Sequence, residues 1–69
     1  MVGLKALMRR VGTSTDVGFL ERSWRYVHSA ADVEALNDNV REWNRLCAAE
    51  REIEMRIAEV RSNTNGGAE

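Results

Sequence analysis

The fold follows from one stretch of the chain, residues 29–62, which reads SAADVEALNDNVREWNRLCAAEREIEMRIAEVRS. This stretch contains neither glycine nor proline, the two residues that most disfavour the interior of a helix. From Leu36 to Val60 its apolar residues recur roughly every 3.5 positions, which is the period of a coiled-coil seam. Ser29 and Asp32 have the spacing of a capping box, a frequent helix start. The stretch therefore predicts one long helix over residues 30–62, about 50 Å long at 1.5 Å per residue.

Two shorter helices are predicted before this stretch, over residues 2–11 and 15–28. Asp16 or a neighbouring hydroxyl residue can cap the second of them, and Gly12 suits the position just after the first. Each helix has an apolar face at helical spacing. The two faces are formed by Leu4, Leu7, Met8 and Val11 in the first helix and by Val17, Leu20, Trp24 and Val27 in the second.

These elements predict an all-α fold in which two short N-terminal helices pack on one long C-terminal helix, as a helical hairpin or three-helix arrangement. A chain of 69 residues is short enough for a single domain, which we expect over residues 1–62. The tail at 63–69 is rich in asparagine and glycine and is expected to be flexible. Ser29 favours a break at residues 28–30, and a continuous or kinked helix is the alternative, because no glycine or proline stands there.

The long helix also predicts self-association. A compact chain of this size has a radius of gyration of only about 11 Å, so part of a 50 Å helix would stay uncovered. An apolar stripe in water promotes aggregation, and a homodimer through the long helix would bury it. Glu50 either pairs with an arginine of the second copy and sets the register, or lies at the edge of the seam. The predicted self-association residues are Trp43, Glu50, Ile53, Ile57 and Val60.

Charge is divided unevenly along a chain whose net charge is -1. Residues 1–28 carry five basic and two acidic side chains, whereas residues 29–69 carry five basic and nine acidic ones. The basic half is therefore expected to pack on the acidic half, within one chain or between two. Nine of the ten basic residues are arginine, which favours an origin in a GC-rich bacterium or a phage. Arginine and aromatic residues dominate many interfaces, and those predicted to bind a partner are Arg9, Arg10, Arg22, Arg25 and Tyr26.

No residue pattern in the chain points to catalysis. A single cysteine, Cys47, rules out an internal disulfide framework and a cysteine-based zinc site, and a single histidine, His28, rules out a histidine-rich metal site. We interpret Cys47 as a buried thiol and His28 as a capping or surface residue at a helix end. Trp24 and Trp43 lie on apolar stripes and are predicted to hold the core. We therefore expect no enzyme activity, no catalytic residues, no metal and no cofactor.

The function predicted from these features is that of a small non-enzymatic protein–protein interaction module, such as an adaptor, an inhibitor or an assembly factor. The alternative is a small regulator that binds nucleic acid through the basic N-terminal half, although the acidic first turns of the long helix would repel phosphate. The apolar stretches are too short for a membrane span, and residues 1–11 do not form a secretory signal. We therefore expect a cytoplasmic protein that binds neither membrane nor nucleic acid.

Overall fold

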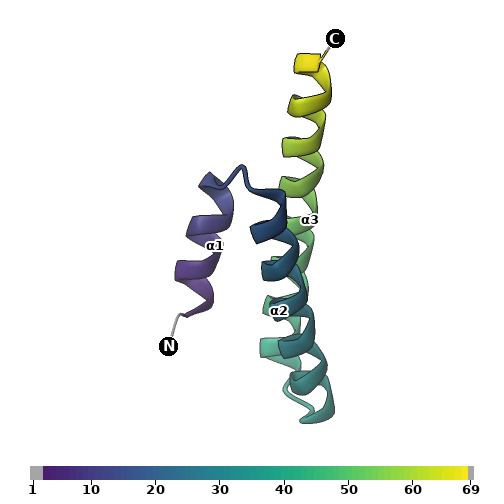
Figure 1. Ribbon diagram of the computed structural model, residues 1–69. Coiled ribbons are helices and arrows are strands. Elements are labelled where there is room, and N and C mark those ends of the chain that lie inside the picture. Colours follow the sequence, from purple (N-terminus) through teal and green to yellow (C-terminus); the bar gives the residue numbers. More distant parts are fainter. Residues whose placement is uncertain (1–2, 69) are drawn as a thin grey trace.

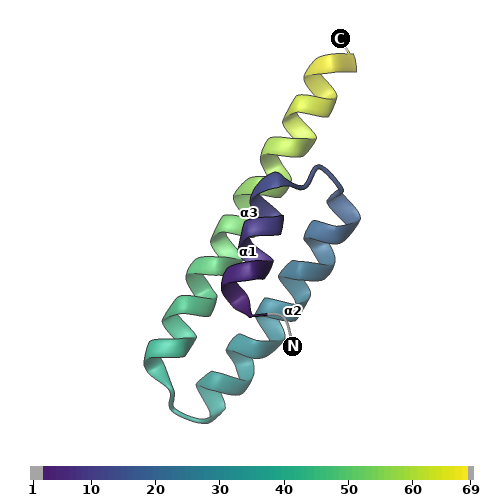
Figure 2. The ribbon, with the colours of Figure 1, turned by 90° about the vertical axis from the view of Figure 1, so that its left-hand side faces the viewer.

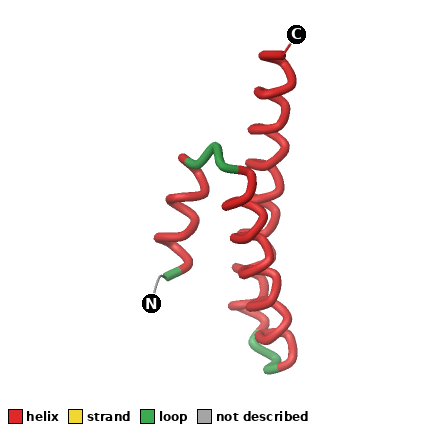
Figure 3. The backbone as a smooth tube through the Cα atoms, in the orientation of Figure 1, coloured by secondary structure: helices red, strands yellow, loops and turns green. Residues whose placement is uncertain are grey.

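The chain forms three helices and no strand over residues 3–68, which a computed structural model describes, with side chains described for residues 3–63. The helices are α1 (Leu4–Thr13), α2 (Val17–Leu36) and α3 (Val40–Ala68) (Figure 1). Loops are confined to Gly3 and to the short segments between the helices (Figure 3). The prediction of an all-α, three-helix arrangement is confirmed. The start of the first helix was expected at residue 2, which lies outside the described residues.

Helices α2 and α3 lie antiparallel and side by side, and α1 lies against one side of the hairpin that they form (Figure 2). The molecule is elongated, with extents of 47 × 20 × 15 Å. Its long axis is set by α3, whose C-terminal turns extend past the start of α2 (Figure 2). None of the described helices combines the length and the apolar content that crossing a bilayer would need.

The expected break at residues 28–30 is wrong. Helix α2 continues through Ser29 to Leu36, and the turn lies eight residues later, at 37–39. Asp38 adopts a φ of 58°, in the left-handed region that asparagine and aspartate tolerate better than most residues. The side-chain amide of Asn39 donates to Glu34 at 2.6 Å and steadies the turn. The Asn-Asp-Asn sequence therefore ends the helix without glycine or proline.

Both ends of the long helix differ from the prediction. Helix α3 begins at Val40 rather than at residue 30, because the first part of the expected helix belongs to α2. It continues through Ala68, so residues 63–68 are helical where a flexible tail was expected. Beginning ten residues late gives the chain two long helices of 20 and 29 residues that can cover each other.

The core lies between α2 and α3 and is closed on one side by α1. Its fully buried side chains include Leu20 and Val27 from α2 and Ile53 from α3, and Val11 of α1 is also buried. The apolar faces predicted for the two N-terminal helices therefore do face the core. At the start of α2 the Asp16 carboxylate accepts a hydrogen bond from the Phe19 amide at 3.3 Å, as its capping position predicts.

Candidate interaction surface

Helix α1 covers only one side of the hairpin. The Arg10 guanidinium lies over the Phe19 ring, 5.3 Å from its centroid, and Arg56 Nε of α3 donates to the Ser14 carbonyl at 3.1 Å. Met8 of α1 faces Met55 of α3 across a shallow hollow. No other described helix lies on the opposite side (Figure 1). We call that side the open face and define it by Trp24, His28, Trp43, Glu50, Glu54 and Ile57.

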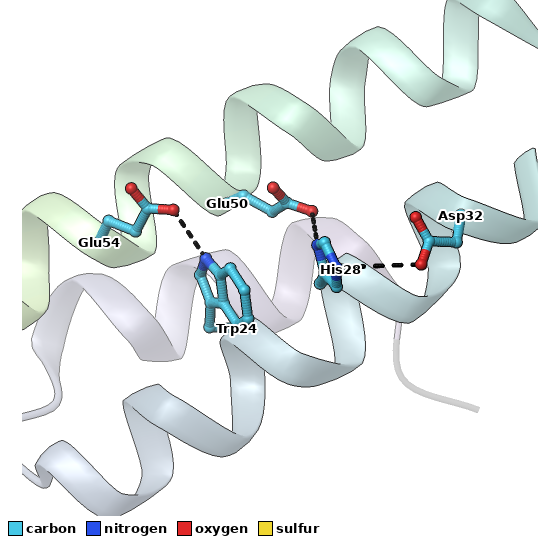
Figure 4. A network of polar contacts seen from close by, with 5 residues as sticks. All are labelled: Trp24, His28, Asp32, Glu50 and Glu54. Atoms are coloured by element: carbon cyan, nitrogen blue, oxygen red, sulfur yellow. Dashed lines mark hydrogen bonds and ion pairs between the residues drawn. The ribbon is translucent and has the colours of Figure 1, made fainter. Parts of the chain in front are cut away.

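A polar network joins the two helices across the middle of the open face (Figure 4). The rings of Trp24 and His28, one turn apart on α2, are stacked with centroids 4.7 Å apart and planes 8° from parallel. The indole Nε1 of Trp24 donates to Glu54 at 2.9 Å. Nδ1 of His28 lies 3.0 Å from the Glu50 carboxylate, and its Nε2 lies 3.9 Å from Asp32. Each aromatic ring is thus tied to a carboxylate of α3.

The outer contact of this network, between His28 and Asp32, adds little to the stability of the fold. The side chains of His28 and Asp32 are 48% and 71% exposed. Ion pairs at such exposure contribute only about 0–1 kcal/mol. Trp24 was predicted to hold the core. It is half-buried and packs against the core from one side. The network therefore fixes the orientation of two rings that stay within reach of solvent.

A shallow hollow lies at each end of the open face, and a tryptophan lines each one. The larger, of about 390 Å³, lies beside Trp24, and the smaller, of about 170 Å³, lies beside Trp43 at the hairpin turn. The prediction that Trp43 holds the core is wrong, because its side chain is 40% exposed. The larger hollow is lined by Glu21, Trp24, Arg25, Glu54 and Ile57, and the smaller by Glu34, Ala35, Asp38, Asn39, Val40 and Trp43.

The residues predicted for self-association divide into two groups. Ile53 and Val60 are 0% and 6% exposed within a single chain, so the uncovered stripe that motivated a dimer does not exist as expected. Trp43, Glu50 and Ile57 are spaced by seven residues, which places them along one flank of α3. That flank belongs to the open face. Glu50 contacts His28 of its own chain, a partner that was not expected for it.

The residues predicted to bind a partner are all exposed, and two of them, Arg10 and Arg22, line one hollow beside Phe19. Arg10 is engaged with Phe19, and Tyr26 is 59% exposed on α2. Arg25 alone borders the open face, beside Trp24. The predicted members are Arg9, Arg10, Arg22, Arg25 and Tyr26, and all lie on α1 and α2.

The basic half packs on the acidic half within one chain, as expected, because α1 and α2 both pack against α3 in the described part of the chain. No arginine of α1 or α2 forms an ion pair with α3 there. The arginine that does bridge the helices belongs to the acidic half, because Arg61 of α3 lies 3.5 Å from Glu21 of α2. The uneven charge of the two halves is therefore not used to hold them together.

Cys47 and His28 also differ from their interpretations. Cys47 is half-buried rather than buried, and His28 is exposed, as expected of a surface residue, but lies in the middle of α2 rather than at a helix end. The contact between His28 and Glu50 was not predicted, because a helix break at residue 29 would have aligned the two helices differently. Within residues 3–68, no three histidine, cysteine, aspartate or glutamate side chains are grouped so that they could hold a metal ion.

The chain matches no family model, no curated protein and no solved structure. What the molecule can bind therefore follows from its own surface chemistry, above all that of the open face.

Proposed function

We propose that this protein is a small non-enzymatic interaction module that binds another protein through the open face of its hairpin. One observation carries the proposal: both tryptophans of the chain lie on the side of the hairpin that α1 leaves uncovered. Tryptophan is among the residues that contribute most to binding free energy at interfaces. Large apolar side chains rimmed by polar groups are typical of interaction surfaces. An adaptor, an inhibitor or an assembly factor would use such a face.

The fixed side-chain conformations on the open face support binding. Trp24 is fixed by a stacked neighbour and by its hydrogen bond to Glu54. A side chain that is already held in one rotamer loses less conformational entropy when a partner binds, which favours affinity. The hollows beside Trp24 and Trp43 are shallow and open, a shape that suits side chains of a partner better than an enclosed small substrate.

The sequence also predicts a homodimer and a cytoplasmic location. A homodimer through the long helix would use Trp43, Glu50 and Ile57, and so would compete with the partner for the open face. A cytoplasmic location would keep the single thiol, that of Cys47, reduced.

A capture experiment tests the proposal. The full chain is immobilised and exposed to a lysate of its source cells, with and without nuclease treatment, in parallel with Trp43→Ala and a matched control, Met55→Ala. Met55 is 66% exposed and faces α1, so its loss removes a similar exposed apolar group from the other side of α3. We expect protein to be captured by the parent chain and by Met55→Ala but not by Trp43→Ala, with unchanged circular dichroism.

Two results would overturn the proposal. Capture that depends on nucleic acid, and disappears with nuclease, would favour a nucleic-acid regulator. Equal capture by Trp43→Ala and the parent chain would move the binding surface away from the open face.

A further inference from the structure

The spacing of the two hollows limits what can bind across them. Glu54 and Ile57 line the hollow beside Trp24, and they lie 11 and 14 residues after Trp43 along α3. At 1.5 Å per residue the two hollows are therefore about 16–21 Å apart. A helix lying parallel or antiparallel to α3 would reach both with apolar side chains three to four turns apart.

The charge of the open face limits the occupant further. Six carboxylates lie on or beside it, against two guanidinium groups, both near the larger hollow. The carboxylates are Glu21, Asp32, Glu34, Asp38, Glu50 and Glu54, and the guanidinium groups are Arg25 and Arg61. Glu50 and Glu54 each accept one bond within the chain, but a carboxylate has about four acceptor sites in all. Both can therefore accept further bonds from a cationic partner.

The same charges argue against other occupants. In a symmetric dimer centred between the two hollows, Glu50 and Glu54 of one copy would lie close to those of the other. Like charges opposed across an interface cost binding free energy and slow association. A phosphate backbone or an anionic lipid surface would be repelled in the same way. The open face therefore favours a partner that combines apolar anchors with positive charge.

The opposite side of the hairpin already holds a segment of this kind. Helix α1 lies there with Leu7 and Met8 packed against the core, and it carries Lys5, Arg9 and Arg10. A basic amphipathic helix therefore already packs along one side of this hairpin. Binding of an amphipathic helix in an apolar groove is also a common mode of recognition.

We infer that the open face binds a basic amphipathic helix of a partner protein, with apolar anchors three to four turns apart in the two tryptophan-lined hollows and basic residues between them. This inference rests on the proposed function and specifies the class of its partner. The basic residues would meet Glu50 and Glu54, and the anchors would pack on Trp24 and Trp43.

Intrinsic fluorescence provides the test, because both tryptophans of the chain lie on the open face. The probe is a synthetic peptide of about 18 residues, without tryptophan, in which leucines form one helical stripe and arginines flank it. One control peptide has the same composition in an order that spreads the leucines around the helix. A second control keeps the stripe and replaces every arginine by glutamate. We expect the probe to change the emission on binding, and both controls to bind at least about tenfold more weakly.

Two variants locate the contact. Glu50→Gln/Glu54→Gln removes two charges while the amide oxygens can still accept from His28 and Trp24, so the fold is retained. We expect the probe to bind this variant about tenfold more weakly and with a smaller salt dependence. The matched control, Glu52→Gln/Glu59→Gln, removes the same charge on the side of α3 that faces α1, and is expected to bind as the parent chain does.

Contrary results would each overturn the inference. Equal binding of the spread peptide would mean that charge alone attracts the probe, and equal binding of the glutamate peptide would exclude a basic partner. Sedimentation of the protein alone that shows a dimer, lost in Trp43→Ala, would identify a second copy as the occupant. If cellular capture depends on Trp43 but the probe does not bind, the proposed function stands and this inference fails. If neither depends on the open face, both fail.

Discussion

The two sides of the α2–α3 hairpin are closed by different contacts. On the covered side, α1 buries Val11 against the core, so that apolar contact closes the surface. On the open face, Trp24 and His28 are held by carboxylates of α3 and remain partly in contact with water. The difference shows how a chain of 69 residues can complete a core on one side and keep aromatic surface available on the other.

The largest effect is expected from a change on the covered side. Val11→Asp places a charge where the native side chain is 2% exposed, and should destabilise the fold by at least about 3 kcal/mol. Trp43→Gln, on the open face, should cost less than about 1 kcal/mol, because that site is solvated. Urea unfolding followed by circular dichroism compares the two. A larger loss in Trp43→Gln would remove the distinction between the two sides.

A smaller effect is expected inside the polar network. Trp24→Phe keeps an aromatic ring beside His28 but deletes the donor to Glu54, and should cost about 1 kcal/mol. The same change in a Glu54→Ala background should cost measurably less, since the acceptor is already gone. Equal losses in the two backgrounds would show that the bond at 2.9 Å does not contribute to stability.

The turn at 37–39 can be tested with one substitution that should lower stability and one that should not. Asp38→Ala should destabilise the hairpin by about 1 kcal/mol, because alanine is strained at a φ of 58°. Asp38→Gly removes that strain and should leave stability unchanged or raised by up to about 1 kcal/mol. Thermal unfolding of the two variants shows which of them is more stable. Alanine as stable as glycine here would contradict the left-handed conformation.

The smallest effect is expected from the exposed arginines of α2. Arg22→Glu/Arg25→Glu should change the free energy of unfolding by less than about 0.5 kcal/mol, because neither guanidinium is paired with α3. Melting temperature and capture of partner protein should be measured on one preparation. A clear drop in melting temperature would instead favour pairing of the basic half with the acidic helix.

Much of the fold could be predicted from local patterns in the sequence. The apolar stripes of residues 4–11 and 17–27 face the core, and Asp16 caps α2, because helical periodicity and capping depend on residues close in sequence. The position of the turn could not be found in this way. Ser29 and Asp32 match a capping box, but the left-handed backbone at Asp38 is what ends the helix.

The candidate site was harder to predict because it depends on register. His28 meets Glu50 only when α2 continues past residue 29 and the chain reverses at 37–39. The same shift buries Ile53 and turns Trp43 outward. Exposed arginine and tyrosine could be recognised from composition, whereas the pairing of Trp24 with Glu54 required the arrangement of two helices.

The three-residue connection at 37–39 also has a kinetic consequence. Pairs of side chains next to it close short loops, whereas the pair of Glu21 and Arg61 at the far end is separated by 40 residues. Loop closure costs more entropy as the loop lengthens. Folding is therefore expected to begin at the turn and to proceed along the hairpin towards Arg61. Proteins with such local topology fold within microseconds to milliseconds.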